Sequence, residues 1–358
     1  MKSCDILVIG GGVIGLSLAW ELRKRGPAVL VVERGEFGGE ASCAAGGMLA
    51  WCDPHLPQAA RELATMSAAC YGEFVGEIEE ASGLAVDLRK SGTIVLEEAP
   101  PGAFAEQCRM LSASELGELE PGLMAAANNP QWWPEWSLDP RRLIACLIAA
   151  CRALGVEMLA GTAAVSVSRS NGRAAGIRTA GAEFSAATVV NCAGAWAGQI
   201  ECGIQPSPSP THPVKGQMLA LEAHGVLKHV VRAPEVYLIP RSNGSVVVGS
   251  TLENAGFDKT TDAATIERLR AAAALLVPAL RNTRIEEAWG GLRPATPDGA
   301  PILGETSLPG YFVASGHYRD GILLAPATAR VMAGLILGVE TGIPAMSPKR
   351  FEIGAAVA

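Results

Sequence analysis

The stretch Ile6-Leu-Val-Ile-Gly-Gly-Gly-Val-Ile-Gly15 decides the fold of this 358-residue chain. Its first four residues form a continuous apolar run of strand length, which is typical of a parallel strand buried on both faces. Apolar residues then recur every four positions from Ile14 to Leu22, and Gly26-Pro27 ends the pattern, so a helix is predicted. A second apolar run over residues 28–32 leads directly to Glu33.

Strand, glycine motif, helix, strand and acidic residue follow one another in the order of a dinucleotide-binding fingerprint. Gly10 permits the tight turn, Gly12 lets the backbone approach a pyrophosphate, and Gly15 lets the helix pack closely on the strand. Free N–H groups at the start of the helix attract the pyrophosphate. Glu33 suits the ribose hydroxyls and would repel a 2′-phosphate, which favours FAD or NAD over NADP.

Composition and charge exclude several classes of protein. The chain is 49% hydrophobic and 18% charged, which describes a compact globular protein, and its length suits two domains. A net charge of −7 argues against nucleic acid as a partner. The nine cysteines contain no C-x-x-C pair and the five histidines show no metal spacing, so neither disulfides nor a metal site are expected.

Nothing in the hydropathy pattern predicts a membrane segment. The longest apolar stretches, residues 143–154 and 322–337, are interrupted by Arg152, and by Pro326 and Arg330. Met1-Lys2 leads directly into the first strand, which leaves no room for a cleaved signal peptide. We therefore expect a cytoplasmic protein.

The segment Gly38–Met48 helps to choose between FAD and NAD. It consists almost wholly of small residues, which would let the backbone lie against a flat ring system. A simple nicotinamide domain would more often continue with another β-α-β unit. This loop therefore favours FAD, and the alternative is that it is merely flexible.

Turn signals and periodicity predict the remaining elements and their grouping. Helices are expected over 57–81, 114–121, 139–154 and 265–276 and from Ile322 onward, and strands over 93–96, 161–182, 188–196, 216–221, 236–240, 245–250 and 311–314. The fold class is α/β, with a Rossmann-like FAD-binding domain interleaved with an antiparallel-sheet α+β substrate-binding domain. The predicted domains are 1–85, 136–208 and 287–358 for FAD, and 86–135 and 209–286 for substrate.

Three tryptophans, Trp132, Trp133 and Trp136, stand in a proline-rich segment that we interpret as a loop. They could line a substrate entrance or form a hydrophobic plug between the domains.

Two C-terminal motifs carry the resemblance to a known family. They are Gly-Leu-Arg293-Pro-Ala-Thr and Gly316-His-Tyr-Arg-Asp-Gly-Ile-Leu-Leu-Ala-Pro-Ala-Thr328. With the N-terminal fingerprint, these motifs make the chain resemble the D-amino-acid oxidase superfamily of flavoproteins, most closely the glycine oxidases of thiamine biosynthesis. The resemblance runs over essentially the whole chain.

The resemblance implies a substrate site around an arginine. Arg293 matches the family arginine that binds the substrate carboxylate, and Tyr237 matches a tyrosine whose hydroxyl adds a donor. Arg319, Met48 and Leu252 complete the expected substrate residues. The alternatives are a structural salt bridge for Arg293, a core aromatic for Tyr237, a surface arginine for Arg319 and core filling for Met48.

Two positions depart from the glycine oxidase pattern. Leu252 replaces an expected methionine, and Glu235 replaces a histidine. The first change is nearly isosteric. The second could alter charge near the entrance and with it the side-chain preference.

The resemblance also implies a set of FAD-binding residues, with the FAD held non-covalently because the last cysteine is Cys202. The set comprises Gly10, Gly12, Val13, Ile14, Gly15, Glu33, Arg34, Ser42, Ala45, Gly46, Gly47, Met48, Val165, Ala193, Gly194, Trp196, Arg293, Gly316, His317, Tyr318, Arg319, Gly321, Ile322 and Leu323.

The implied activity is oxidative deamination of glycine, sarcosine or small D-amino acids. Hydride would pass from Cα to flavin N5, and the imine would give an oxo acid and ammonia or feed thiazole synthesis for thiamine. Molecular oxygen would be the acceptor and hydrogen peroxide the product. Two alternatives remain, a D-amino-acid dehydrogenase that reduces a quinone and a non-catalytic flavoprotein subunit of a larger complex. A homo-oligomer is also left open.

Overall fold

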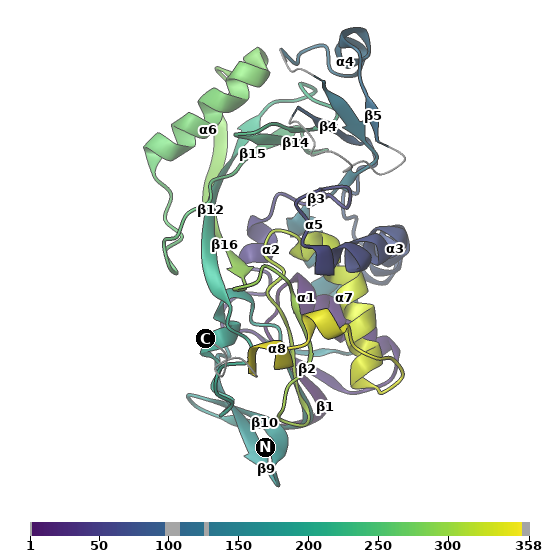
Figure 1. Cartoon of the computed structure of the whole chain (residues 1–358), viewed down its shortest axis with the longest axis vertical. Coiled ribbons are helices and arrows are strands. Elements are labelled where there is room, and N and C mark those ends of the chain that lie inside the picture. Colours follow the sequence, from purple (N-terminus) through teal and green to yellow (C-terminus); the bar gives the residue numbers. More distant parts are fainter. Residues whose placement is uncertain (1, 97–107, 125–128, 353–358) are drawn as a thin grey trace.

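The computed structural model describes residues 2–96, 108–124 and 129–352. Two sheets organise these residues, and each belongs to its own region of an elongated molecule (Figure 1). Residues 97–107 and 125–128 of the predicted substrate-binding domain, and residues 1 and 353–358 of the predicted FAD-binding domain, lie outside the described ranges.

The first sheet has a parallel centre, as the N-terminal fingerprint predicts. Its main path runs in the order β17-β18-β11-β1-β2-β8, and β18, β11, β1, β2 and β8 are mutually parallel. An antiparallel hairpin, β9 and β10, extends from β11. The strands are β1 (Lys2–Ile9), β2 (Val29–Val32), β8 (Glu157–Leu159), β9 (Ala164–Ser170), β10 (Arg173–Thr179), β11 (Glu183–Asn191), β17 (Ile302–Glu305) and β18 (Tyr311–Ser315).

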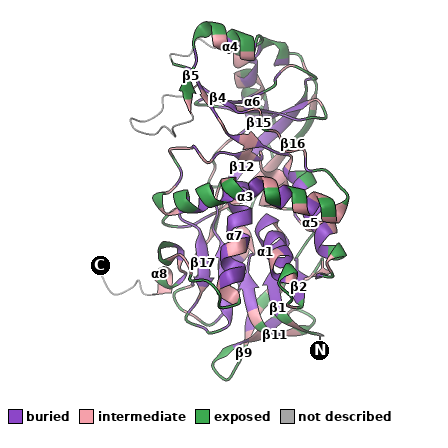
Figure 2. Cartoon of the chain, turned by 90° about the vertical axis from the view of Figure 1, so that its right-hand side faces the viewer, coloured by how far each residue is buried: buried purple, intermediate pink, exposed green. Residues whose placement is uncertain are grey.

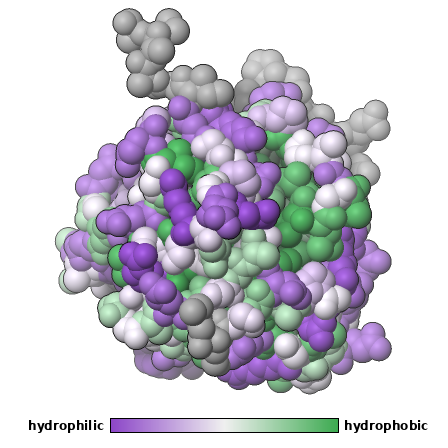
Figure 3. All heavy atoms as spheres, turned by 90° about the horizontal axis from the view of Figure 1, so that it is seen from below, coloured by the Kyte–Doolittle hydropathy of each residue, from purple (hydrophilic) through white to green (hydrophobic). Residues whose placement is uncertain are grey.

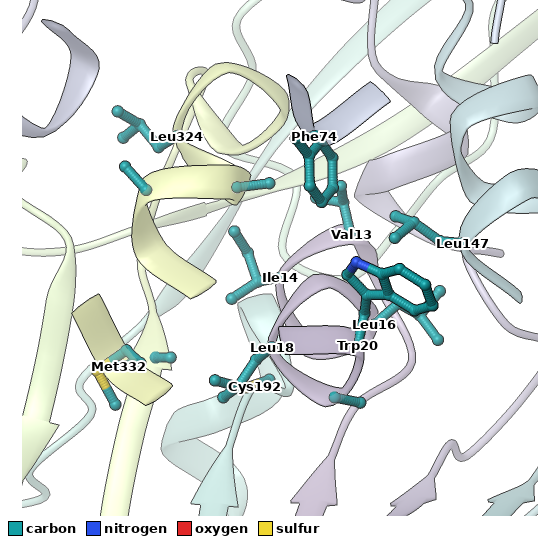
Figure 4. Packing of buried hydrophobic residues seen from close by; sticks show 14 of the residues in the cluster. Val13, Ile14, Leu16, Leu18, Trp20, Phe74, Leu147, Cys192, Leu324 and Met332 are labelled. Carbon is teal, nitrogen blue, oxygen red and sulfur yellow. The ribbon is translucent and has the colours of Figure 1, made fainter. Parts of the chain in front are cut away.

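Both faces of β1 are covered, so the predicted two-sided burial is confirmed. Ile6 and Val8 pack with the helices α1 (Val13–Lys24), α3 (Gln58–Ser82), α5 (Pro140–Ala153) and α7 (Gly321–Ile336). Leu7 and Ile9 belong to a second cluster with side chains of β9 and β10. Figure 4 shows α1 beside α7, with Ile14 and Leu18 of α1 on the side toward α7. Figure 2 shows α1 and α7 as mostly buried, whereas α3 exposes much of its outer side.

The second sheet is largely antiparallel. Its order is β16-β12-β15-β14-β13-β4-β6-β5, and only β13 and β4 form a parallel pair. In Figure 1 the long strands β12 and β16 run from the region of α6 down toward the nucleotide-binding region. The elements are β4 (Thr93–Val95), β5 (Arg109–Met110), β6 (Gln131–Trp133), β12 (His212–Glu222), β13 (Val230–Arg232), β14 (Tyr237–Pro240), β15 (Ser245–Gly249), β16 (Ile285–Ala295), α4 (Ala113–Leu119) and α6 (Ala263–Leu276).

The remaining elements are short. They are α2 (Ala41–Ala44), β3 (Met48–Leu49), β7 (Trp136–Ser137), η1 (Gly194–Gln199), η2 (Pro278–Leu280), η3 (Pro344–Met346) and α8 (Lys349–Glu352). Because α2 lies inside the segment 38–48 and β3 begins at its last residue, Met48, that segment is less uniformly a loop than its composition predicts.

The predicted tryptophan loop is wrong. Trp132 and Trp133 lie in β6, paired with β4, and Trp136 lies in β7, paired with β3. The prolines that suggested a loop, Pro130 and Pro134, flank β6 and leave its three residues free to pair. Trp133 is buried, and its indole N–H donates to Gln131 Oε1 at 2.9 Å.

The α/β class with two interleaved sheets is confirmed, whereas the domain limits remain a prediction. The predicted boundary between residues 286 and 287 would divide β16 between the two domains. However, β16 pairs with β12 of the second sheet from Ile285 to Ala295. On this pairing we propose that the boundary lies after Ala295.

A pair of glycine substitutions tests the packing of α1 on the sheet. A Cβ at Gly15 would lie 2.0 Å from the carbonyl oxygen of Gly10, so Gly15→Ala should lower the free energy of unfolding by about 2 kcal/mol or more. Gly76 is exposed in the middle of α3 with nothing within 4 Å of its added Cβ. Gly76→Ala should therefore raise stability by about 0.5–1 kcal/mol. Urea unfolding of both apoproteins measures the two changes, and equal stabilities would contradict this packing.

Candidate active site

A cavity of about 900 Å³ lies between the two sheets, near the upper end of the size range of ligand sites. Ile9, Val32 and Cys192 line it at the carboxyl ends of three parallel strands. Met218, Tyr237 and Arg293 line it from the second sheet. The chain leaves β1 toward β2 on one side and has β11 on the other, so this is the topological switch point where ligands of such sheets bind.

The glycine loop at the start of α1 forms a cradle for a pyrophosphate. Gly10 has φ +106°, and a Cβ there would lie 2.4 Å from the carbonyl oxygen of Cys192. A Cβ at Gly12 would lie 3.1 Å from Ser42 Oγ, which accepts a hydrogen bond from the Val13 amide at 2.9 Å. Gly10, Gly12 and Val13 all line the cavity. Space for a close ligand and a helix N-terminus together fit the pyrophosphate of FAD.

Glu33 also has a structural role that the sequence does not indicate. Its carboxylate is buried and accepts hydrogen bonds from the amides of Gly11 (2.8 Å) and Gly35 (2.9 Å). It therefore fixes the glycine loop against the end of β2. Each carboxylate oxygen can accept a further hydrogen bond, and Glu33 lines the cavity, so the predicted ribose contact remains available.

Arg293 presents an unneutralised positive charge to the cavity. Its guanidinium donates to the carbonyl of Thr251 at 3.1 Å and to Ser250 Oγ at 2.6 Å, and both acceptors are neutral. Within the described residues no ion pair to Arg293 is found, which speaks against the structural salt bridge. A Cβ at Gly216 would lie 2.4 Å from both terminal nitrogens, so this glycine makes room for the guanidinium.

Tyr237 lines the same cavity from β14, which β15 and β12 separate from the strand of Arg293 in the second sheet. Gly249 pairs with both Tyr237 and Met218 in the strand register, and a Cβ at Gly249 would lie 2.7 Å from the Tyr237 hydroxyl. The hydroxyl reaches Met218 Sδ at 3.6 Å. Met48 lines the cavity and also packs against the buried cluster that contains Met218 and Ile239, so it combines the two roles weighed for it.

The loop before α7 closes another side of the cavity. Gly321 and Ile322, the first residues of α7, line the cavity, so the positive end of the helix dipole faces it. Tyr318 has φ +49°, and its amide donates to the carbonyl of Pro294 at 3.0 Å, which joins this loop to β16. His317 contacts Thr328 Oγ1 through Nε2, and burial lowers its pKa to about 3, so it stays neutral.

Most of the predicted residues meet at this cavity, including the exposed Leu252 and Val165. Three do not line it, namely Gly15, Gly316 and Leu323. Gly15 acts in packing, and a Cβ at Gly316 would lie 2.4 Å from Thr296 Cγ2. Leu323 is 1% exposed and belongs to the helical core. These three residues pack behind the residues that line the cavity.

An ion-pair network on the cavity wall was missed by the sequence reasoning. Arg232, beside Tyr237 in the strand register, binds Asp53 at 2.9 Å and lies 3.7 Å from Glu135. Asp53 also lies 3.9 Å from Arg319, which is 42% exposed and lines the cavity. The sequence does offer a signal of this network, because Arg232 is a charged residue that ends a buried apolar strand. The network joins the segment after β3 to the second sheet.

Glu135 gives this network a dependence on pH. Burial raises the pKa of Glu135 to about 7, and the negative charge of Asp53 adds to this while Arg232 opposes it. Between pH 5 and 7 the folded protein therefore holds a proton that the unfolded chain releases. Its free energy of unfolding falls as the pH rises through this range.

Glu135→Gln should remove this titration. We compare the unfolding free energy of the variant with that of the unmodified apoprotein at each pH. This difference should be roughly 2 to 3 kcal/mol more in favour of the variant at pH 8 than at pH 5. Urea unfolding at the two pH values measures the change, and Glu36→Gln, on the exposed loop after β2, is the control. A difference from the unmodified protein that does not vary with pH would contradict the prediction.

Comparisons with known proteins identify the family. The profile described as DAO, FAD dependent oxidoreductase, matches residues 5–335. The chain therefore belongs to the DAO family, and it is an FAD-dependent oxidoreductase. The glycine cradle at the start of α1 fits the pyrophosphate of such a cofactor.

Particular relatives narrow the class. A glycine oxidase of Pseudomonas putida is 35% identical over 94% of this chain and 96% of its own. A bifunctional protein ThiO/ThiG of Synechocystis is 35% identical over 97% of this chain, which spans only 54% of that relative. The crystal structure of glycine oxidase from Geobacillus kaustophilus superimposes with a TM-score of 0.90 at 30% identity over the whole of both chains.

No helix within the described ranges is both long and apolar enough to cross a membrane. The face seen from below in Figure 3 carries hydrophilic residues over much of its area, with hydrophobic residues gathered toward one side.

Proposed function

We propose that this protein oxidises glycine, sarcosine and small D-amino acids with FAD as cofactor. The products are an imine, which hydrolyses to an oxo acid and ammonia, and hydrogen peroxide formed from oxygen. The observation that carries the proposal is Arg293, a cation with neutral partners that faces the cavity, which Tyr237 also lines. The names of the glycine oxidase relatives support the same substrate class.

Arg293 anchors the substrate carboxylate. A guanidinium presents two parallel N–H donors that match two carboxylate oxygens, and such charged hydrogen bonds are stronger than neutral ones. Gly216 leaves the guanidinium room against β12, and Ser250 and Thr251 hold it in place. The Tyr237 hydroxyl adds a donor from β14, on the far side of β15 from β12. Two fixed donors orient Cα toward the cavity interior.

Bound FAD supplies the hydride acceptor. The N-terminus of α7 directs its partial positive charge into the cavity, where it stabilises negative charge that develops on the oxidant. His317, kept neutral by burial, adds no competing charge at this end. An amine that reacts in its neutral form needs no side-chain base.

The FAD is held without a covalent bond in this proposal. Gly10, Gly12 and the start of α1 bind the pyrophosphate, and Glu33 accepts from the ribose. The small residues of segment 38–48 lie against the ring system, since Ala45, Gly46, Gly47 and Met48 line the cavity. A Cβ at Gly46 would lie 2.8 Å from Ile239 Cδ1, so a larger residue there would require the end of that side chain to move.

Small substrates are favoured by the walls of the site. Met48 and Tyr237 pack against the cluster that contains Met218, and all three side chains line the cavity and take up space in it. Glu235 adds a negative charge to the lining, which disfavours acidic side chains. We further propose that the imine serves thiazole synthesis for thiamine, a role supported by the ThiO/ThiG relatives.

Anaerobic mixing of the purified yellow protein with glycine, sarcosine, D-alanine and D-proline tests the proposal. Loss of flavin absorbance that returns quickly in air would support an amine oxidase and rank its substrates. Loss without return in air would indicate the dehydrogenase that reduces a quinone. Flavin that no amine reduces, with oxygen or with artificial acceptors, would favour the non-catalytic subunit.

A further inference from the structure

One segment of the second region, residues 253–262 between β15 and α6, reaches across to the nucleotide-binding region. The ring of Phe257 lies 5.0 Å from that of Trp196, with 31° between their planes. The Lys259 ammonium lies 3.0 Å from Glu40 Oε2. Trp196 and Glu40 line the FAD cavity, whereas Phe257 and Lys259 lie outside its lining.

Arg34, the residue after Glu33, contacts the same two side chains, Trp196 and Glu40. The Arg34 guanidinium carbon lies 3.5 Å from the centre of the Trp196 ring, and its Nη2 donates to Glu40 Oε1 at 2.7 Å. Glu40 therefore binds Arg34 and Lys259 at once, and Trp196 contacts Arg34 and Phe257. Five side chains form one connected group at the adenosine end of the cavity.

The segment itself is fixed to the second sheet. Glu253 forms a β-bridge with Lys215, and the Gln217 amide donates to Glu253 and to Asp262 at 3.0 Å each. In the middle of the segment the carbonyl of Lys259 packs on β16, where a Cβ at Gly290 would lie 2.4 Å from it. Because both ends and the middle are held, Phe257 and Lys259 are presented at fixed positions.

We propose that residues 253–262 form a clasp that retains the adenosine half of FAD. Phe257 is a positioning residue, since it holds Trp196, and Lys259 holds Glu40 and thereby Arg34. Trp196 and Arg34 then form a fixed wall where the adenosine lies. The proposal rests on the FAD binding proposed above and extends it, because it couples the substrate-binding region to retention of the cofactor.

The rate of FAD release tests the clasp without an activity assay. Holoenzyme is diluted into buffer, and the rise in fluorescence of free FAD is followed. We expect Phe257→Ala to release FAD about three- to tenfold faster than the unmodified protein, the size of an aromatic pair contact. Thr261→Ala, an exposed position in the same segment, is the matched control and should leave the rate unchanged.

Two further measurements separate the clasp from a general structural defect. The Phe257 ring packs on Trp196 in the apoprotein as well, so Phe257→Ala should lower the Tm of the apoprotein only slightly and that of the holoenzyme by more. In a Trp196→Ala background the Phe257 substitution should have no additional effect on FAD release, since the contact it removes is absent. An equal effect in both backgrounds would overturn the role assigned to Phe257.

The outcomes also separate the clasp from the function on which it rests. Unmodified protein that holds FAD, with a Phe257→Ala variant that releases it at the same rate, would overturn the clasp alone. Purified protein that binds no FAD at all would overturn the clasp together with the proposed function.

Discussion

Arg293→Leu is expected to lower kcat/KM for the preferred amino acid about 10²- to 10⁴-fold. The guanidinium would supply two charge-assisted hydrogen bonds to the substrate carboxylate, each worth roughly 1.5–3 kcal/mol. Leucine offers no donor and leaves the carboxylate facing a low-dielectric wall. Most of the loss should appear as a raised KM, because the carboxylate is bound in the ground state as well as in the transition state. Steady-state kinetics at saturating FAD measure the split.

Arg293→Lys is the matched control for this prediction. Lysine keeps the positive charge but cannot present two parallel donors, so a loss of about tenfold is expected. FAD content should stay the same in both variants, since the donors of Arg293 are directed to Thr251, Ser250 and the substrate. Unchanged kinetics of Arg293→Leu would remove Arg293 from the substrate site.

Glu33→Ala should raise the Kd of FAD roughly 30- to 1,000-fold. The variant loses the ribose acceptor and also leaves the amides of Gly11 and Gly35 without their present partner. Leaving a buried donor unpaired costs about 1–3 kcal/mol, and the glycine cradle that holds the pyrophosphate would lose its fixed shape. Titration of the apoprotein with FAD, followed by quenching of flavin or tryptophan fluorescence, measures the change.

Glu36→Ala is the control for the charge change. It removes a carboxylate from the exposed loop three residues further on, so the Kd of FAD should remain within about twofold of the unmodified value. Glu33→Gln keeps one acceptor oxygen and should give an intermediate Kd. If Glu33→Ala retained FAD as firmly as the unmodified protein, Glu33 would have no part in the binding.

The nucleotide-binding half was readable from the sequence because its signals are local. Buried parallel strands are continuous apolar runs, the helix repeats every 3.6 residues, and a glycine turn has its own backbone chemistry. The helix from Asp139-Pro140 likewise follows from its capping residue and first-turn proline, and Asp139 caps α5 through the Arg141 amide. Each of these segments fixes its own conformation before any partner is known.

The tryptophan segment and the ion-pair network show where this reasoning fails. Pro130 and Pro134 are strong turn signals. The three residues between these prolines nevertheless pair with β4, which lies some 40 residues earlier in the chain. Arg232 and Asp53 are 179 residues apart, and Glu135 comes from a third segment. No local pattern records such a meeting, because it depends on how two sheets pack.

By itself, the sequence determined the dinucleotide-binding half, the α/β class and the identity of the residues suited to a flavin and a carboxylate. Only the tertiary structure decided that Arg293 has neutral partners and space against Gly216, that Glu33 holds the glycine loop, and that residues 253–262 reach Trp196 and Glu40 at the cavity. The physical reason is range. Backbone propensity and periodicity act between neighbours in the chain, whereas the charge, burial and free space around a side chain are set by segments that meet only when the chain has folded.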